Sequence, residues 1–290
     1  TINALALNAQ GQIIDLFHGL EDLQNKRLKA VGIAAERFQE DALRMMRGLR
    51  FVSQLGFDLE EQTQAAITTH APLLSKISVE RICIEFEKLL LGQNAQQAFQ
   101  LFIATDCFKY CPELADKQHF LQQMSEILRF PIQDLSVAWC LLIDQLEIAI
   151  KHQKTFLKEW KLSNQRIHEV LLLREALEII KQRPLDVLDY YQLNETCLTQ
   201  LFYIAPFYDL ALSKESLLNQ YRLLVIHSLK DLAINGNDLM RALNRRGGLW
   251  LKETLAHCER AVLLKEVANE REALLNYAQE FVNLRNKTAD

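Results

Sequence analysis

EDALRMMRGLRF, residues 40–51, decides the fold of the first half of the chain. It continues an apolar pattern that begins at residue 38 and recurs at steps of three and four residues. That period is typical of an amphipathic helix, because residues three and four apart lie on the same helix face. The pattern predicts one helix of about five turns, from residue 36 to a stop at Gly56. Its apolar positions are Phe38, Ala42, Met45, Leu49 and Val52.

The composition of the whole chain indicates the same fold class. Nine glycines and five prolines in 290 residues are about 3% and 2%, against roughly 7% and 5% in average proteins. Glycine and proline weaken helices more than any other residues, so a chain poor in both is typical of a mainly α protein. We therefore expect a mainly α fold. The composition excludes an all-β sandwich and disfavours a glycine-loop dinucleotide fold.

Only the first 33 residues contain a pattern typical of β-strands. TINALALN and IIDLF are short apolar runs separated by the turn-like residues 9–12, which predicts a hairpin. Residues 19–25 predict a short helix, and RLKAV at 27–31 alternates like a third strand. Three strands do not make a core of their own. We therefore expect this segment to be the end of a sheet whose beginning is absent from the sequence.

The rest of the chain predicts a series of helices separated by breakers. Asp58 and Glu61 are the expected capping pair of a helix that ends near residue 70. Ser78 is the expected N-cap of a helix that ends at Gly92. The other expected helices span residues 95–105, 117–128, 133–150, 164–181, 213–229, 238–243 and 249–285, the last interrupted at 268–269.

Charge and motif content exclude several classes of function. The formal net charge is −4, so a nucleic-acid partner would have to contact a local basic patch. No apolar run reaches the roughly 18 residues of a membrane span, and six cysteines are too few for a disulfide scaffold, so we expect a cytoplasmic protein. The sequence contains neither a P-loop nor a Gly-x-Ser-x-Gly elbow. Cys107, Cys111 and His119 lack a fourth metal ligand, which favours core packing over a metal site.

On a helical wheel, Asp41 and Arg44 lie side by side on the face away from the core. Their spacing alone favours an ordinary surface salt bridge. The same geometry would also let one carboxylate and one guanidinium contact a ligand together, and the residues alone leave both interpretations open.

The order of four motifs resembles that of a known enzyme family. TINALALN, DLFHG, EDALR and SVERICIEFEKLL follow one another as motifs B, C, D and E do in class II tRNA nucleotidyltransferases, the bacterial CCA-adding enzymes and related poly(A) polymerases. INGNDLM and VANEREALL resemble the tail of that family. The chain departs from it at Gly248-Leu249, where the family has Gly-Pro.

The resemblance implies an elongated helical protein in four parts. Residues 1–33 would be the end of a nucleotidyltransferase head, 34–92 the neck, 93–202 the body and 203–290 the tail. The implied activity is addition of C, C and A to the 3′ end of tRNA from CTP and ATP, without a nucleic-acid template. Two alternatives stay open, a poly(A) polymerase of the same class and a non-catalytic RNA-binding relative that lacks the head.

The resemblance also implies the residues that select the nucleotide. Cytosine and adenine each present an amino group beside an unprotonated ring nitrogen, whereas uracil and guanine present a carbonyl beside a ring N–H. A carboxylate accepts from the amino group and an arginine donates to the ring nitrogen. Asp41 and Arg44 match these two roles in the family. Arg47 and Arg50 match further nucleotide contacts, and Glu40 is expected to hold either Arg44 or a neighbouring loop in place.

The family's catalytic metal site has no counterpart in the sequence. Nucleotidyl transfer needs two metal ions, Mg²⁺ in this case, and the family holds them with an Asp-x-Asp pair before motif B. We assign no catalytic or metal-binding residue to this chain. We expect those carboxylates upstream of Thr1, and we expect the chain alone to be inactive.

Two basic segments are candidates for tRNA contact. Lys151, Lys154 and Lys158 are spaced like one stripe of a helix, and phosphate contacts dominate affinity for nucleic acids. Arg245 and Arg246 form a basic turn. A solvated surface is the simpler interpretation of both.

Overall fold

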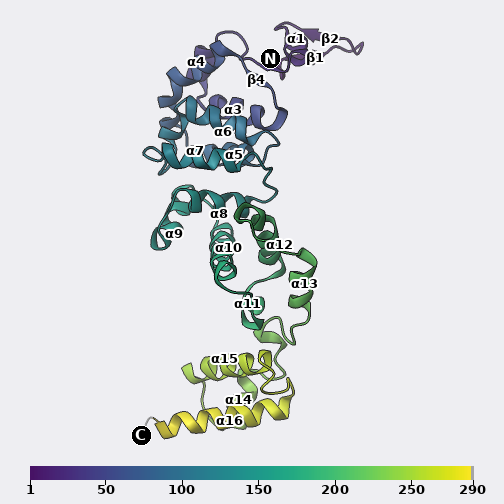
Figure 1. Cartoon of the computed structure of the whole chain (residues 1–290), viewed down its shortest axis with the longest axis vertical. Coiled ribbons are helices and arrows are strands. Elements are labelled where there is room, and N and C mark those ends of the chain that lie inside the picture. Colours follow the sequence, from purple (N-terminus) through teal and green to yellow (C-terminus); the bar gives the residue numbers. More distant parts are fainter. Residues whose placement is uncertain (289–290) are drawn as a thin grey trace. The chain divides into compact units, whose positions relative to one another are not determined.

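The computed structural model describes residues 1–288. The fold is mainly α, as the composition predicts (Figure 1). The chain divides into two compact units, which are described separately. Unit 1 contains Thr1–Arg174 and Pro206–Asp209, and unit 2 contains Glu175–Ala205 and the residues from Leu210 onward. The four-part division into head, neck, body and tail stays a prediction.

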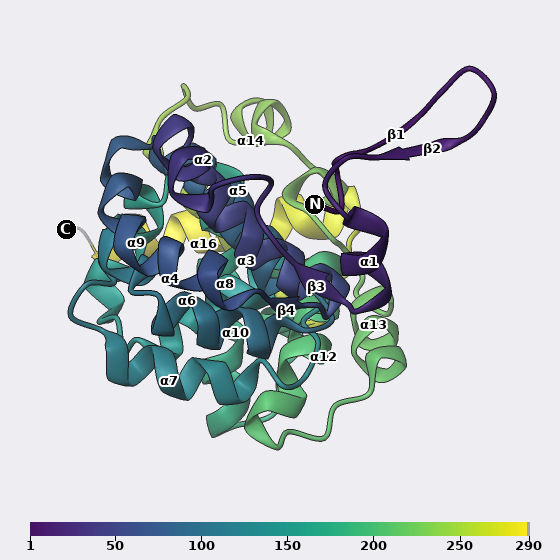
Figure 2. The same ribbon diagram turned by 90° about the horizontal axis from the view of Figure 1, so that it is seen from above.

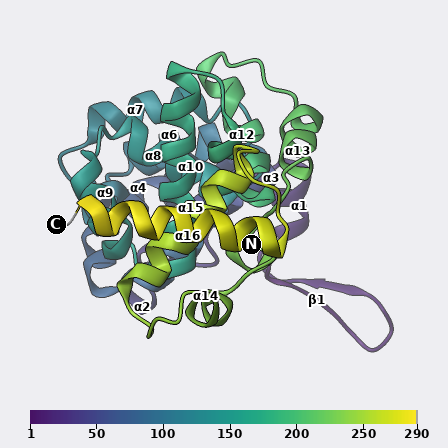
Figure 3. The same ribbon diagram turned by 90° about the horizontal axis from the view of Figure 1, so that it is seen from below.

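The predicted N-terminal hairpin is confirmed. Strand β1, Leu5–Leu7, pairs antiparallel with β2, Ile13–Asp15, and helix α1, Gly19–Gln24, follows. Figures 2 and 3 show the hairpin extending away from α1. Large apolar side chains stay exposed on it, since Leu7 is 71% and Leu16 75% exposed.

The predicted third strand does not join that hairpin. Strand β3, Arg27–Leu28, pairs instead in parallel with β4, Asp58–Leu59. The backbone carbonyls of Lys26 and Leu28 accept the N–H groups of Asp58 and Glu60 at 2.8 and 2.9 Å. The prediction of Asp58 as a helix cap is therefore wrong, because Asp58 belongs to a strand. Glu60 caps the next helix, α4, Glu61–His70, by accepting the N–H of Thr63 at 2.8 Å.

The predicted five-turn helix is two helices. Helix α2, Ala34–Glu40, ends at Asp41, whose backbone is extended with φ −150° and ψ 102°, and α3 spans Leu43–Leu55. The apolar pattern survives this break, because its five predicted positions are all buried. Gly56 ends α3 in the left-handed region, φ 66°, as predicted.

Helix α3 packs against α5, Val79–Leu90, and α6, Ala95–Ala104. Gly92 follows α5 for a reason other than the predicted one. Its φ lies outside the left-handed region, and a Cβ there would lie 2.0 Å from Ser53 Oγ. The glycine is therefore required by the close approach of α3 rather than by the end of the helix.

The rest of unit 1 is also helical. The predicted helices at 95–105 and 117–128 are confirmed, whereas the one predicted at 133–150 ends at Gln145, before Glu147 with its left-handed φ of 51°. The lysine stripe lies on a separate helix, α9. The elements not yet given are η1 Ala71–Lys76, η2 Cys107–Tyr110, α7 Gln118–Ile127, α8 Leu135–Gln145, α9 Ile150–Glu159, α10 Asn164–Gln182, which continues into unit 2, and η3 Ala205–Tyr208.

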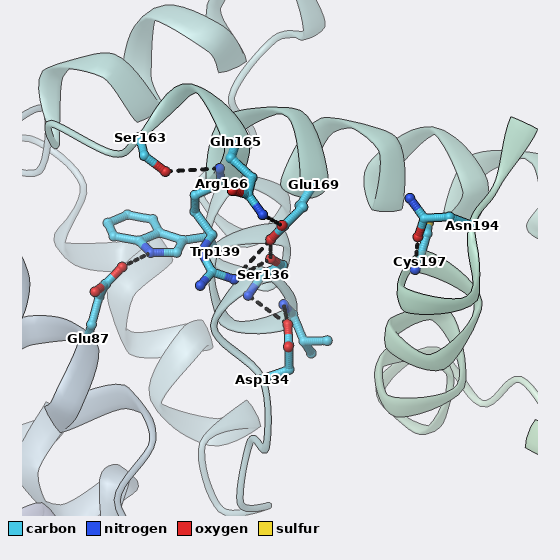
Figure 4. Close-up of polar contacts among 11 residues, drawn as sticks. Glu87, Asp134, Ser136, Trp139, Ser163, Gln165, Arg166, Glu169, Asn194 and Cys197 are labelled. Atoms are coloured by element: carbon cyan, nitrogen blue, oxygen red, sulfur yellow. Dashed lines mark hydrogen bonds and ion pairs between the residues drawn. The ribbon is translucent and has the colours of Figure 1, made fainter.

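Helix α8 is anchored by polar contacts to two other helices, which Figure 4 shows. The indole Nε1 of the buried Trp139 donates to Glu87 Oε1 of α5 at 2.9 Å. At the start of α8, Ser136 Oγ accepts from Arg166 of α10 at 2.8 Å and donates to Glu169 at 3.1 Å. These contacts fix α5, α8 and α10 around a buried aromatic core. That core contains Phe86, Phe99, Phe102, Trp139 and Trp160.

Unit 2 holds the C-terminal helices around its own core. The predicted helices near 238–243 and 249–285, with the interruption at 268–269, are confirmed as three helices, whereas the one predicted at 213–229 ends at Arg222. Helices α11 and α12 were not predicted. The elements are α11 Val187–Gln192, α12 Glu195–Ile204, α13 Lys214–Arg222, η4 Leu229–Asp231, α14 Gly236–Ala242, α15 Leu249–Leu263 and α16 Arg271–Thr288. The core includes Leu239, Cys258, Val262, Leu274 and Ala278.

Candidate functional site

A cavity of about 380 Å³ lies in unit 1 between the N-terminal segment and helices α2, α3 and α4. Three arginines and one lysine line it, together with apolar and small polar side chains. The lining residues are Thr1, Ile2, Asn3, Leu28, Lys29, Ala30, Val31, Arg37, Phe38, Arg44, Arg47, Gly48, Phe51, Leu59, Thr63 and Ile67.

One carboxylate holds two of the arginines in place. Glu40 Oε1 lies 2.8 Å from Arg37 Nη2, and Glu40 Oε2 lies 2.8 Å from Arg44 Nη1. Arg44 Nη1 also donates to the backbone carbonyl of Arg37 at 3.3 Å. Arg47 is exposed and forms no ion pair with any described residue. Three guanidiniums against one carboxylate make this part of the cavity cationic, which suits an anionic ligand such as a phosphate.

The break between α2 and α3 changes the predicted geometry of Asp41. The helical wheel places Asp41 and Arg44 on one helix, and this is wrong because Asp41 lies outside both helices. Asp41 Oδ1 accepts the N–H of Leu43 at 3.1 Å, and Asp41 Oδ2 pairs with Arg81 of α5 at 3.1 Å. The side chains of Asp41 and Arg44 thus have different partners, Arg81 and Glu40. Among the described residues, their only link is through the backbone, where the N–H of Arg44 donates to the Asp41 carbonyl at 3.1 Å.

Arg50 lies in a different environment from the other arginines. It pairs with Glu85 of α5 at 3.1 Å, with both side chains about nine-tenths buried, and its guanidinium stacks on Phe51. Arg50, Asp41 and Glu40 are not among the described residues that line the cavity. The ion pair of Arg50 and Glu85 therefore ties α3 to α5.

Several lining residues have no counterpart in the sequence prediction. Arg37 reaches the cavity from α2, seven residues before Arg44, and this spacing of two helical turns is the signal that could have identified it. Phe51 and Ile67 supply apolar surface. Thr63 Oγ1 accepts the N–H of Ala30 at 3.2 Å and so joins α4 to the segment after β3. That segment, distant in sequence from α4, carries no local signal for the contact.

The described residues do not fit a divalent metal site. No group of three His, Cys, Asp or Glu side chains is close enough in residues 1–288 to hold a metal ion. Asp15, in DLFHG, is fully engaged by the backbone, and the N–H groups of Leu20 and Gly19 lower its pKa. Cys107 and Cys111 are buried, and burial raises the pKa of Cys107 to about 12, so its thiol stays protonated.

The two predicted basic segments are both exposed. On α9, Lys151, Lys154 and Lys158 face solvent, while the opposite face buries Phe156 and Leu157. In unit 2, Arg245 stacks on Trp250, its guanidinium carbon 5.0 Å from the ring centre. Trp250 Nε1 donates to the carbonyl of Arg246 at 2.9 Å, so the turn between α14 and α15 is held by its own aromatic residue.

None of the helices described in residues 1–288 combines the length and apolar character needed to cross a membrane.

Two family models match the chain. Residues 130–278 match the model of tRNA nucleotidyltransferase domain 2. Residues 56–118 match the model described as "Probable RNA and SrmB-binding site of polymerase A". Together the matches extend from the end of α3 into α16.

Similar proteins of known function are CCA-adding enzymes. The chain is 43% identical over 280 residues to the CCA-adding enzyme of Enterococcus faecalis, covering 97% of this chain and 69% of that protein. It is 43% identical over 289 residues to that of Anoxybacillus flavithermus, covering 96% and 69%. Among solved structures, the CCA-adding enzyme of Bacillus stearothermophilus in complex with CTP superposes with a TM-score of 0.87 at 35% identity, covering 99% of this chain and 73% of that one.

Proposed function

The chain belongs to the tRNA nucleotidyltransferase family, and on that premise we propose that its cavity binds CTP and ATP for addition of CCA to the 3′ end of tRNA. The observation that carries the proposal is the cluster of Arg37, Arg44 and Arg47 at one cavity. A nucleoside triphosphate combines an anionic chain with a flat apolar base. Guanidiniums bind phosphate oxygens, and the Phe51 ring offers an apolar surface for the base.

Base selection is assigned to Arg44, which lines the cavity, and to Asp41, which does not line it but accepts the backbone N–H of Arg44 at 3.1 Å. Asp41 would accept the amino group that cytosine and adenine share, and Arg44 would donate to the neighbouring ring nitrogen. Glu40 would orient Arg44, because its carboxylate lies 2.8 Å from that guanidinium. Arg47 is proposed as a phosphate contact. Arg50 is proposed to act indirectly, by holding α3 against α5 through Glu85.

We propose that the two Mg²⁺ ions of nucleotidyl transfer are held by carboxylates outside residues 1–288. The described residues contain no cluster able to hold a metal ion, and two-metal chemistry requires one. We propose that the hairpin contacts the part of the protein that carries these carboxylates. Its exposed Leu7, Ile13, Leu16 and Phe17 form the kind of apolar surface that marks an interface. On this proposal the chain alone incorporates no nucleotide.

For tRNA, we propose two contact surfaces, the lysine stripe of α9 and the Arg245–Arg246 turn. Both are exposed and basic on a chain with a net charge of −4. Phosphates would be their ligands, because exposed Lys and Arg side chains supply the sequence-independent part of nucleic-acid affinity. We further propose that the protein works in the cytoplasm, where reduced thiols persist, since Cys83, Cys107, Cys111, Cys197 and Cys258 are free and buried.

A poly(A) polymerase is the second candidate, because residues 56–118 match a model named for polymerase A. The two functions differ in the bases that the site accepts. A CCA-adding enzyme takes cytosine and adenine, whereas a poly(A) polymerase takes adenine alone.

Equilibrium binding of the four nucleoside triphosphates to the chain tests the proposal. We expect CTP and ATP to bind and UTP and GTP to bind at least about tenfold more weakly, because one good base contact discriminates by roughly 1–3 kcal/mol. Binding of ATP without CTP would favour the poly(A) polymerase. Equal binding of all four nucleotides, or of none, would contradict base selection in this cavity.

A further inference from the structure

Arg37 lines the cavity but has no role among the proposed nucleotide contacts, which are assigned to Arg44 and Arg47. Arg37 lies in the last turn of α2, whereas Arg44 belongs to α3. The helical backbone is broken between them at Asp41, whose φ is −150° and ψ 102°. A continuous helix therefore does not fix the Arg44 side chain relative to α2, and contacts across the break have to do so.

Glu40, the last residue of α2, joins the two arginines through its two carboxylate oxygens. Oε1 lies 2.8 Å from Arg37 Nη2, and Oε2 lies 2.8 Å from Arg44 Nη1. Because each oxygen has its own partner, the carboxylate cannot rotate without breaking one of the two pairs. The side chains of Arg37, Glu40 and Arg44 are 40, 45 and 41% exposed, and a single ion pair at such exposure fixes a side chain only weakly. The pair with Arg37 therefore helps to keep Glu40 in the orientation in which it meets Arg44.

The backbone of Arg37 also contacts the residues beyond the break. Its carbonyl accepts the N–H of Asp41 at 3.3 Å and Arg44 Nη1 at 3.3 Å. Arg44 Nη1 is thus held twice by the last turn of α2, once by this carbonyl and once by Glu40. Among the described residues, the contacts of the Arg44 guanidinium all use Nη1, which leaves Nε and Nη2 for a ligand.

We propose that Arg37 is a positioning residue for base selection, which holds the Arg44 guanidinium through Glu40. This inference rests on the proposed function, in which Arg44 donates to the ring nitrogen of cytosine or adenine. Arg37 Nη2 pairs with Glu40, and Arg37 Nε is buried without a partner among the described residues. These two nitrogens are turned away from a ligand, which favours a positioning role over a direct contact with the nucleotide.

Arg37→Ala separates the two roles by its effect on the four nucleoside triphosphates. Loss of a direct phosphate contact would weaken CTP, ATP, UTP and GTP alike, because all four carry the same phosphates. Loss of a positioning contact would weaken CTP and ATP more than UTP and GTP. We expect the preference for CTP and ATP to fall about two- to fivefold, the size of effect that an exposed ion pair produces. The readouts are the four dissociation constants and the midpoint of thermal unfolding.

The same substitution in a Glu40→Ala chain tests whether Arg37 acts through Glu40. We expect Glu40→Ala to reduce the preference at least as much as Arg37→Ala does, and Arg37→Ala to add nothing once Glu40 is absent, because coupled residues are not additive. Lys109→Ala is the matched control. Lys109 pairs with Asp106 at 2.8 Å, with the same spacing of three residues and similar exposure, and we expect that variant to keep the full preference.

The outcomes separate this inference from the proposed function. An unchanged chain that binds all four nucleotides equally, or none, contradicts the proposed function. If the unchanged chain prefers CTP and ATP, three results overturn the positioning role alone: a folded Arg37→Ala variant that keeps the full preference, an equal loss of affinity for all four nucleotides, or a further loss of preference in the Glu40→Ala chain. If Arg37→Ala does not fold, Arg37→Met decides, because methionine is unbranched and fills the space without the charge. An unchanged preference in that variant overturns the inference.

Discussion

Arg81 Nη2 of α5 lies 3.1 Å from Asp41 Oδ2, in the link between α2 and α3. The other oxygen of Asp41 accepts the N–H of Leu43, the first residue of α3. Two neighbouring helices thus fix one carboxylate, on an extended residue that a continuous helix could not present in this way. A base edge that meets Asp41 would find its carboxylate already oriented, which is what selective hydrogen bonding requires.

The buried pair of Arg50 and Glu85 predicts a large loss of stability when one partner is removed. Glu85→Ala leaves the Arg50 guanidinium buried and unpaired, so we expect the free energy of unfolding to fall by about 3–5 kcal/mol. Denaturant unfolding measures it. Arg81→Ala is the control: its pair with Asp41 is exposed, and we expect less than about 1 kcal/mol. Similar losses in the two variants would contradict the difference in burial.

The contact of Gly92 with Ser53 predicts that any side chain there destabilises unit 1. A Cβ on Gly92 would lie 2.0 Å from Ser53 Oγ and 2.6 Å from the Ser53 carbonyl carbon, and backbone cannot move aside cheaply. We expect Gly92→Ala to lower the free energy of unfolding by at least about 1–3 kcal/mol. Gly48→Ala in α3, where the new Cβ would meet only Ile67 Cδ1 at 3.9 Å, serves as the comparison. A Gly92→Ala variant as stable as the unchanged chain would contradict this packing.

The hydrogen bonds of Asp189 in unit 2 predict how the stability of the fold depends on pH. Its hydrogen bonds from Arg183, at 2.5 and 2.9 Å, hold the pKa of the carboxyl below its usual value. Because the pKa is lower in the folded state, this stabilisation is present above the unfolded pKa, near 3.9, and is lost as the pH falls through the folded value. We expect Asp189→Asn to be less stable than the unchanged chain at pH 7 and the difference to narrow below about pH 4. A difference that stays constant from pH 7 to pH 3 would show that the carboxylate charge is not responsible.

The lysine stripe of α9 predicts a salt-dependent contribution to tRNA binding. We expect replacement of Lys151, Lys154 and Lys158 by alanine to weaken binding and to reduce the slope of log affinity against log salt by roughly one unit per lost phosphate contact. Titration of tRNA at several salt concentrations measures both. Lys26→Asn, at an exposed lysine outside both segments matched by the family models, is the control. Unchanged affinity and slope in the triple variant would make the stripe an ordinary solvated face.

Part of this fold could be predicted because its signals are local. The hairpin follows from two apolar runs around a turn, and the buried face of α2 and α3 follows from apolar spacing. The break at Asp41 is invisible to that spacing, since Phe38, Ala42 and Met45 stay buried on both sides of it. The β3–β4 pair escapes prediction for a different reason, because two residues pair with two others about thirty positions away.

The candidate site could likewise be predicted only in part. Arg44 and Arg47 line the cavity, and the resemblance to the family had already singled them out. The seven-residue spacing from Arg44 could have singled out Arg37, whereas the lining residues of the N-terminal segment and of α4 emerge only when the helices are placed, because they are distant in sequence from α3. The wheel also gave Asp41 the wrong neighbour, because it assumed helical backbone at a residue that tertiary contacts hold extended.

The most direct test of base selection is the binding of CTP, ATP, UTP and GTP to Asp41→Ala, Arg44→Ala and the double variant. We predict that each single change reduces the preference for CTP and ATP over UTP and GTP by about 10- to 100-fold, since each removes one contact to the base edge. The double variant should lose less than the sum of the two, because both residues contact one base. The midpoint of unfolding should shift little, as both side chains are partly exposed. An Asp41→Ala variant that keeps the full preference for CTP and ATP would contradict the account.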